Sequence, residues 1–81
     1  MSPAGPRINE LTDEMNRLQD RYNRHSAQVQ RAMKDYDESP DGHPAKARAT
    51  ADMSKFSDMV HADERALTIV IDELESLGAF E

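Results

Sequence analysis

The side chains that could do chemistry are three histidines and the carboxylates near them. Asp58 and His61 are three residues apart, so on a helix they would share one face and could together ligate a metal ion. A carboxylate-bridged metal centre in a helical protein needs several such elements from several helices. We therefore expect His61 to be a surface histidine, and we predict no metal site.

A second group consists of Tyr22, His25 and Asp63, which interrupt otherwise apolar stripes. Asp63 could accept a hydrogen bond from Tyr22 or His25, and such a polar layer fixes the register of paired helices. The alternative is that the three side chains are partly exposed and do not interact. One carboxylate and one imidazole do not complete a catalytic site, and the chain has no glycine-rich phosphate loop. We predict no catalytic residue, no cofactor and no enzyme.

The elements that position these residues are two long apolar stripes, each with alternating steps of three and four residues. This spacing is typical of a coiled-coil seam on an α-helix. The first stripe comprises Ile8, Leu11, Met15, Leu18, Tyr22, His25, Val29, Ala32 and Tyr36, and the second comprises Ala49, Met53, Phe56, Val60, Asp63, Leu67, Val70, Leu74 and Leu77.

The two stripes match when the chain is folded back on itself, because every predicted cross-helix pair then adds to 85, as Leu11 and Leu74 do. In this register Glu14 lies near Glu73, and Asp35 near Asp52. Like charges do not favour the pairing, so the apolar layers and the turn must determine it.

The break between the stripes is Ser39–Pro44. Pro40 disfavours helical geometry at Ser39, so the first helix should end there. Asp41 can hydrogen-bond the local backbone, and Gly42 can adopt a positive φ, as turns often require. Pro44 suits the first turn of a new helix. The sequence therefore predicts an all-α protein, an antiparallel two-helix hairpin. We expect a mobile tail over residues 1–6, a helix over about 7–38, a turn over 39–44 and a helix over about 45–77.

Composition limits the functions that such a hairpin can have. The 81 residues are 37% apolar, lack cysteine and carry a net charge of −6, which argues against nucleic-acid partners. No apolar run approaches the roughly 20 residues that cross a bilayer, so we predict no membrane insertion. The N-terminus has no basic segment followed by an apolar one, and we expect no cleaved signal peptide.

The second helix carries more apolar residues than its stripe uses. Ile69, Val70 and Ile71 are consecutive and therefore spread over about 200° of a helix surface. A broad apolar patch on a small protein usually marks a contact surface. We predict an assembly or partner interface formed by Met59, Ala66, Leu67, Ile69, Val70, Ile71, Leu74, Leu77 and Phe80.

The segment Ala32–Ala45, with its two prolines around the turn, resembles the needle subunits of bacterial type III secretion systems. Phe56 lies where that family tends to have an aromatic residue, and Ile69-Val70-Ile71-Asp72 is similar to its apolar-then-charged C-terminal segment. The resemblance implies a secreted subunit that polymerises through its C-terminal helix into a hollow filament. It also implies export without a cleavable signal, after chaperones have kept the subunit soluble in the cytoplasm.

Three functions are consistent with the sequence. The first is a structural subunit that self-assembles through its C-terminal helix. The second is a small helical adaptor or co-chaperone that binds one partner protein through the same surface. The third is a simple coiled-coil dimer that forms a four-helix bundle.

Overall fold

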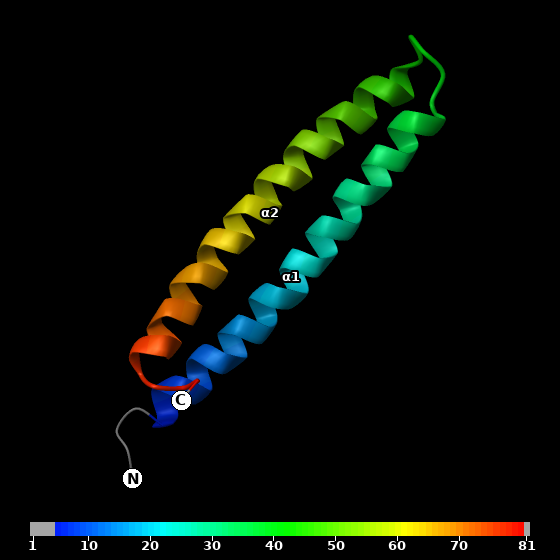
Figure 1. Cartoon of the computed structure of the whole chain (residues 1–81). Helices are drawn as coiled ribbons and strands as arrows, with labels where there is room; N and C mark the ends of the chain where they lie inside the picture. The colour runs from blue at the N-terminus through cyan, green and yellow to red at the C-terminus, as the bar shows by residue number, and fades with distance from the viewer. Residues whose placement is uncertain (1–4, 81) are drawn as a thin grey trace.

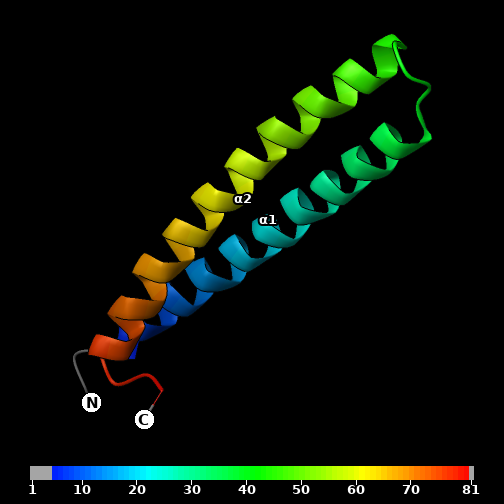
Figure 2. The same ribbon diagram turned by 45° about the horizontal axis from the view of Figure 1, so that its top comes forward.

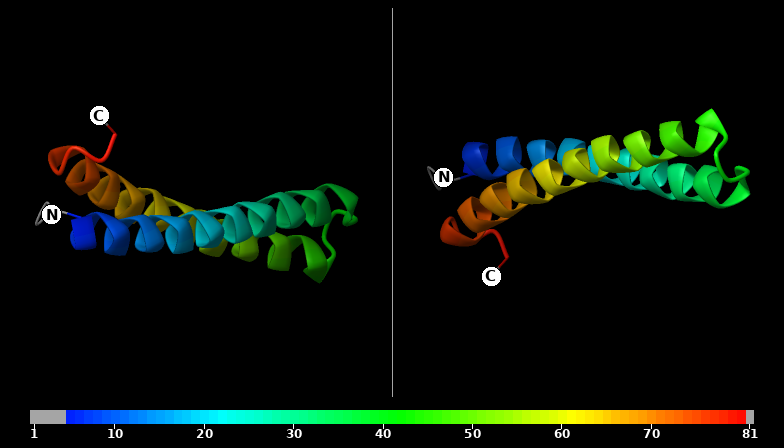
Figure 3. Two further views of the ribbon diagram at one scale, coloured as in Figure 1. Left: turned by 90° about the horizontal axis from the view of Figure 1, so that it is seen from below. Right: turned by 90° about the horizontal axis from the view of Figure 1, so that it is seen from above.

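The computed structural model describes residues 5–80, which form two long helices joined by a tight turn. Helix α1 (Gly5–Glu38) and helix α2 (Pro44–Ser76) are antiparallel and lie side by side, so that the start of α1 is next to the end of α2 (Figures 1 and 2). The views in Figure 3 show that the helices cross at a shallow angle. The molecule measures 63 × 16 × 14 Å, and the predicted all-α hairpin is confirmed.

The N-terminal tail is shorter than we predicted, because Gly5 and Pro6 already belong to α1. The first N–H groups of a helix have no partner within it, so a proline there loses no hydrogen bond. Residues 1–4, the rest of the predicted tail, lie outside the described residues. Helix α2 begins at Pro44, where His43 is the N-cap and its Nδ1 accepts a hydrogen bond from the Ala45 N–H at 3.0 Å.

The turn between the helices is a β-turn, closed by the His43 N–H donating to the Pro40 carbonyl at 3.1 Å. Gly42 has a φ of 77°, the left-handed conformation that a type II turn requires at its third residue. The Asp41 carboxylate accepts from Lys46 Nζ at 2.7 Å, rather than from the local backbone as predicted. The same ammonium lies 4.5 Å from the centre of the Tyr36 ring.

The hydrophobic core follows the two predicted stripes, and every buried residue of the hairpin belongs to one of them. The bulky part lies near the chain ends, where Leu11, Leu18, Val70 and Leu74 form one cluster. Near the turn the buried residues are only Ala32 and Ala49. Because alanine adds little apolar area, the half with the chain ends supplies most of the burial energy.

The C-terminal end of α2 forms a Schellman motif. Gly78 has a φ of 78°, its N–H donates to Glu75 O, and the Ala79 N–H donates to Leu74 O, both at 3.0 Å. Ala79 then packs against the core cluster. Ala79 therefore belongs to the packed end of the hairpin, whereas Phe80 is exposed.

Candidate functional site

The polar layer is centred on Asp63, whose side chain is only 1% exposed. His25 Nδ1 lies 2.5 Å from Asp63 Oδ2, and Arg21 Nη2 lies 3.4 Å from Oδ1, so both carboxylate oxygens have a basic partner. His25 is half-buried, and its ring centroid lies 6.4 Å from that of Phe56. A buried carboxylate held in this way fixes the register of the two helices, because a shifted pairing would leave it unpaired.

Of the two predicted donors to Asp63, the structure uses His25 and not Tyr22. Tyr22 is half-buried in the stripe and takes no part in the bond. Arg21 was missed, because it lies beside the stripe rather than in it. The length of the arginine side chain could have indicated this contact. An arginine next to the seam can lay its apolar stem along the seam and bring its charged end to a buried carboxylate.

Flanking charge also contributes a cross-helix pair that the sequence did not indicate. Arg7 donates from Nε and Nη2 to the two carboxylate oxygens of Glu73, both at 3.0 Å. The hydrogen bonds to Glu73 and Glu10 raise the pKa of Arg7. Glu73 is therefore paired with a cation, although the sequence placed it only near Glu14.

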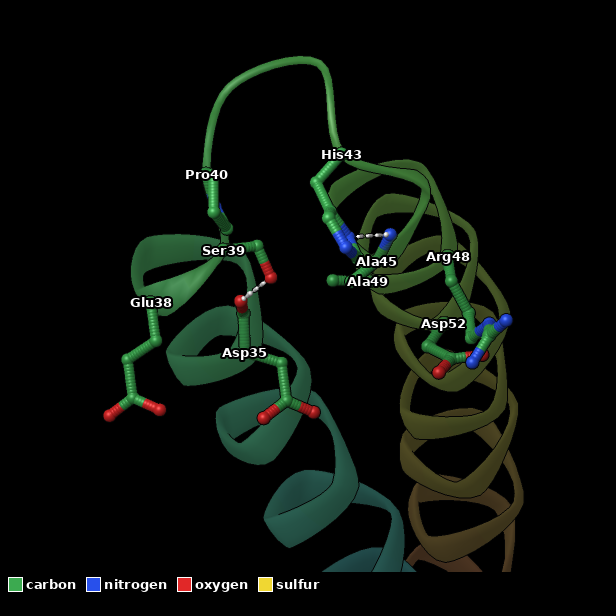
Figure 4. Close-up of a pocket in the computed structure, with 9 residues that line it drawn as sticks. All are labelled: Asp35, Glu38, Ser39, Pro40, His43, Ala45, Arg48, Ala49 and Asp52. Carbon is green, nitrogen blue, oxygen red and sulfur yellow. Dashed lines mark hydrogen bonds between the residues drawn. The ribbon is translucent and has the colours of Figure 1, made fainter.

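A pocket of about 310 Å³ opens beside the turn, between the end of α1 and the start of α2 (Figure 4). It brings together Asp35 and Asp52, as the register predicts, with Arg48 on the α2 side. Ser39 Oγ donates to the Asp35 carbonyl and ends α1, while the Glu38 side chain points away from α2 (Figure 4). These side chains define the end of the hairpin and form no catalytic arrangement.

Asp58 and His61, the possible metal ligands, are both exposed. Within residues 5–80, no group of three or more histidine, cysteine or acidic side chains is arranged to hold a metal ion. Neither helix of the described chain is long and apolar enough to cross a membrane.

The predicted assembly interface divides into three groups in the structure. Val70 and Leu74 are 5% and 1% exposed, so placing them in an interface with another molecule was wrong: they form the core of the hairpin. Ile69 and Phe80 are 68% and 59% exposed. The remaining members are half-buried at the edges of the seam: Met59, Ala66, Leu67, Ile71 and Leu77.

No protein-family model, no curated protein and no solved structure matches this chain. The features that bear on its function are therefore those of the hairpin itself: a register fixed by the buried Asp63, and apolar side chains left on the surface.

Proposed function

We propose that this chain is a structural subunit that self-assembles through apolar side chains that α2 leaves at the surface. The observation that carries the proposal is Ile69, a large aliphatic side chain that is 68% exposed about two turns before the end of α2. Fully burying such a side chain is worth roughly 1.5–3 kcal/mol. Contact with another molecule would recover that free energy.

The neighbours of Ile69 extend the apolar surface along α2. Ala66 is three residues earlier and therefore lies on the same face, one turn away. Met59 lies two turns beyond Ala66, and Phe80 adds an exposed ring near the end of the chain. Together these residues form a strip along which another helix can pack.

The resemblance of residues 32–45 to type III secretion needle subunits supports a filament as the form of the assembly. In that setting the hairpin is exported and then polymerises, with α2 supplying the contacts. The well-defined turn and the exposed Phe80 ring suit a subunit that is used in many identical copies.

Sedimentation velocity over a wide concentration range, with electron microscopy of the concentrated protein, tests the proposal. We expect species larger than a monomer, and we expect Ile69→Asp to remove them. Thr68→Asp is the matched control, because Thr68 is also exposed on α2 and its hydroxyl only bonds back to Glu64 O. A single monomeric species at the highest concentration would contradict self-assembly.

A second candidate function is an adaptor or co-chaperone that binds one partner protein. It is favoured by the burial of Val70 and Leu74, because the hairpin already completes its own core without another copy. Co-purification from the source cells of one partner at fixed stoichiometry, lost in Ile69→Asp, would support this candidate over self-assembly.

A further inference from the structure

The hairpin has two long faces, one on each side of the seam, and their flanking residues differ in charge. On one side, the seven-residue spacing of α1 places Thr12, Gln19, Ser26 and Met33 next to the seam. The corresponding row of α2 is Thr50, Ser57, Glu64 and Ile71. We call this side the neutral face, because Glu64 is its only charged flanking residue.

The opposite side, which we call the charged face, carries charge on most of its flanking residues. The flanking residues are Arg7, Glu14, Arg21, Gln28 and Asp35 from α1, and Asp52, Met59, Ala66 and Glu73 from α2. Its long side chains cross the seam: Arg7 reaches Glu73, and Arg21 reaches Asp63. The hairpin therefore covers this side of its seam with its own side chains.

The burial of the seam residues shows the result. In α1 the seam residues towards the charged face include Leu11, Leu18 and Ala32, and these are buried. Most seam residues towards the neutral face are half-buried: Ile8, Met15, Tyr22 and Val29 in α1, with Met53, Val60 and Leu67 in α2. Leu74, at the end of the same row, is the exception at 1% exposed. The short side chains beside the half-buried residues do not cover them, so apolar surface remains open along this face.

A groove of about 210 Å³ lies near the middle of the neutral face, lined by Ser26, Val29, Gln30, Ser57 and Val60. The two valines come from opposite helices and form its apolar floor, while the serines beside them are too short to fill it. A groove bordered by small residues admits the side chains of another helix at close approach.

The threonines of the neutral face require no outside partner. Thr12 Oγ1 donates to Ile8 O at 2.8 Å, and Thr50 Oγ1 donates to Lys46 O at 3.0 Å. Each hydroxyl is satisfied by its own helix, so covering it with another molecule leaves no unpaired donor. At the turn end of the same face, Met33 is 52% exposed.

The geometry points to a second copy of this chain as the occupant, with the neutral faces of the two hairpins packed together into a four-helix bundle. This inference rests on the proposed self-assembly, and it places the contact on the neutral face, whereas Ala66 and Ile69 lie on the other side of the seam. A chain with a net charge of −6 repels its own copies across most of its surface. The neutral face can meet itself while bringing few like charges together.

The neutral face runs along the 63 Å length of the hairpin. A typical specific interface buries roughly 800 Å² per partner, so a stable dimer requires the two faces to be in contact over most of that length. Four-helix bundles are built from antiparallel hairpins with apolar seams of this kind.

The test compares Ser57→Glu, in the groove, with Ala51→Glu, which places the same side chain at an exposed position of α2 that faces away from the seam. Sedimentation equilibrium should show a dimer for the unmodified chain and for Ala51→Glu. Ser57→Glu should weaken dimerisation at least about 100-fold, because it places two buried charges in the interface. Circular dichroism checks that both variants remain helical.

Small-angle scattering supplies a readout that does not depend on variants. The Cα radius of gyration of one hairpin is 17.9 Å. Two hairpins stacked at the 8–10 Å spacing of packed helices give roughly 19 Å, whereas an end-to-end pair gives roughly 36 Å.

The outcomes separate the inference from the proposed function. A dimer of roughly 19 Å that Ser57→Glu dissociates and Ile69→Asp leaves intact supports the neutral face and self-assembly, and shows that Ile69 is not the contact. An assembly that Ile69→Asp disrupts and Ser57→Glu leaves intact overturns the assignment to the neutral face and keeps self-assembly. A monomer at all concentrations overturns both, even when a foreign protein binds the neutral face.

Discussion

Replacing His25 by leucine should destabilise the hairpin far more than removing its partner Asp63. The Asp63 side chain is 1% exposed and that of His25 is 22% exposed, so water can solvate an unpaired imidazole but not an unpaired carboxylate. Removing one partner of a buried ion pair costs about 3–5 kcal/mol. Arg21 remains 3.4 Å from the carboxylate, so we expect His25→Leu to cost about 2–3 kcal/mol.

Asp63→Ala removes the buried charge itself and should cost at most about 1 kcal/mol. The double variant places a leucine across from an alanine, with a combined volume close to that of the original pair. Replacing a buried ion pair by apolar residues of similar volume is often neutral or stabilising. We therefore expect the double variant to be about as stable as the unmodified chain, with a coupling energy of about 2–4 kcal/mol.

Urea unfolding followed by circular dichroism at one fixed protein concentration measures all four proteins, because association would otherwise shift the apparent stability. A domain of 81 residues has a total stability of about 4–12 kcal/mol, so a 2 kcal/mol loss is well resolved. The reasoning is refuted if His25→Leu is neutral, or if the double variant is less stable than His25→Leu alone.

Two further substitutions test the core and the turn. Leu74→Ala should lower the free energy of unfolding by about 2–5 kcal/mol, because Leu74 is 1% exposed in the main cluster. Leu67→Ala, at a half-buried position, is the comparison and should lower it less. Equal losses of stability in urea unfolding would contradict the observed core. Gly42→Ala should lower the free energy of unfolding by about 1 kcal/mol, because Gly42 has a φ of 77°, which is unfavourable for alanine. A Cβ at this position would meet no atom within 4 Å, so only backbone strain contributes. Gly5→Ala, also in open space but helical, is the control and should be neutral in the same unfolding measurement.

The arrangement of the hairpin could be predicted because it depends on periodic and local signals. Steps of three and four residues identify one stripe on each helix, and all the buried residues lie in those stripes. Gly42 and Gly78 occur where a positive φ is required, and both adopt it. The pairing of Leu11 with Leu74 in one cluster likewise follows from matching two stripes across a short turn.

The predicted helix boundaries were less accurate than the predicted stripes, because helix ends depend on single hydrogen bonds rather than on periodicity. Gly5 and Pro6 extend α1 beyond the predicted start. Ala79 is held by one backbone bond to Leu74, and a pattern of residue types does not distinguish that bond from fraying.

Periodicity by itself determined which residues share a stripe on each helix, since 3.6 residues per turn is a property of the backbone. Tertiary structure alone decided which side of each stripe is covered. Arg7 and Arg21 reach acids on the opposite helix, and no local rule anticipates these contacts because the acids are far away in sequence. The neutral face therefore becomes visible only when the two helices are placed together.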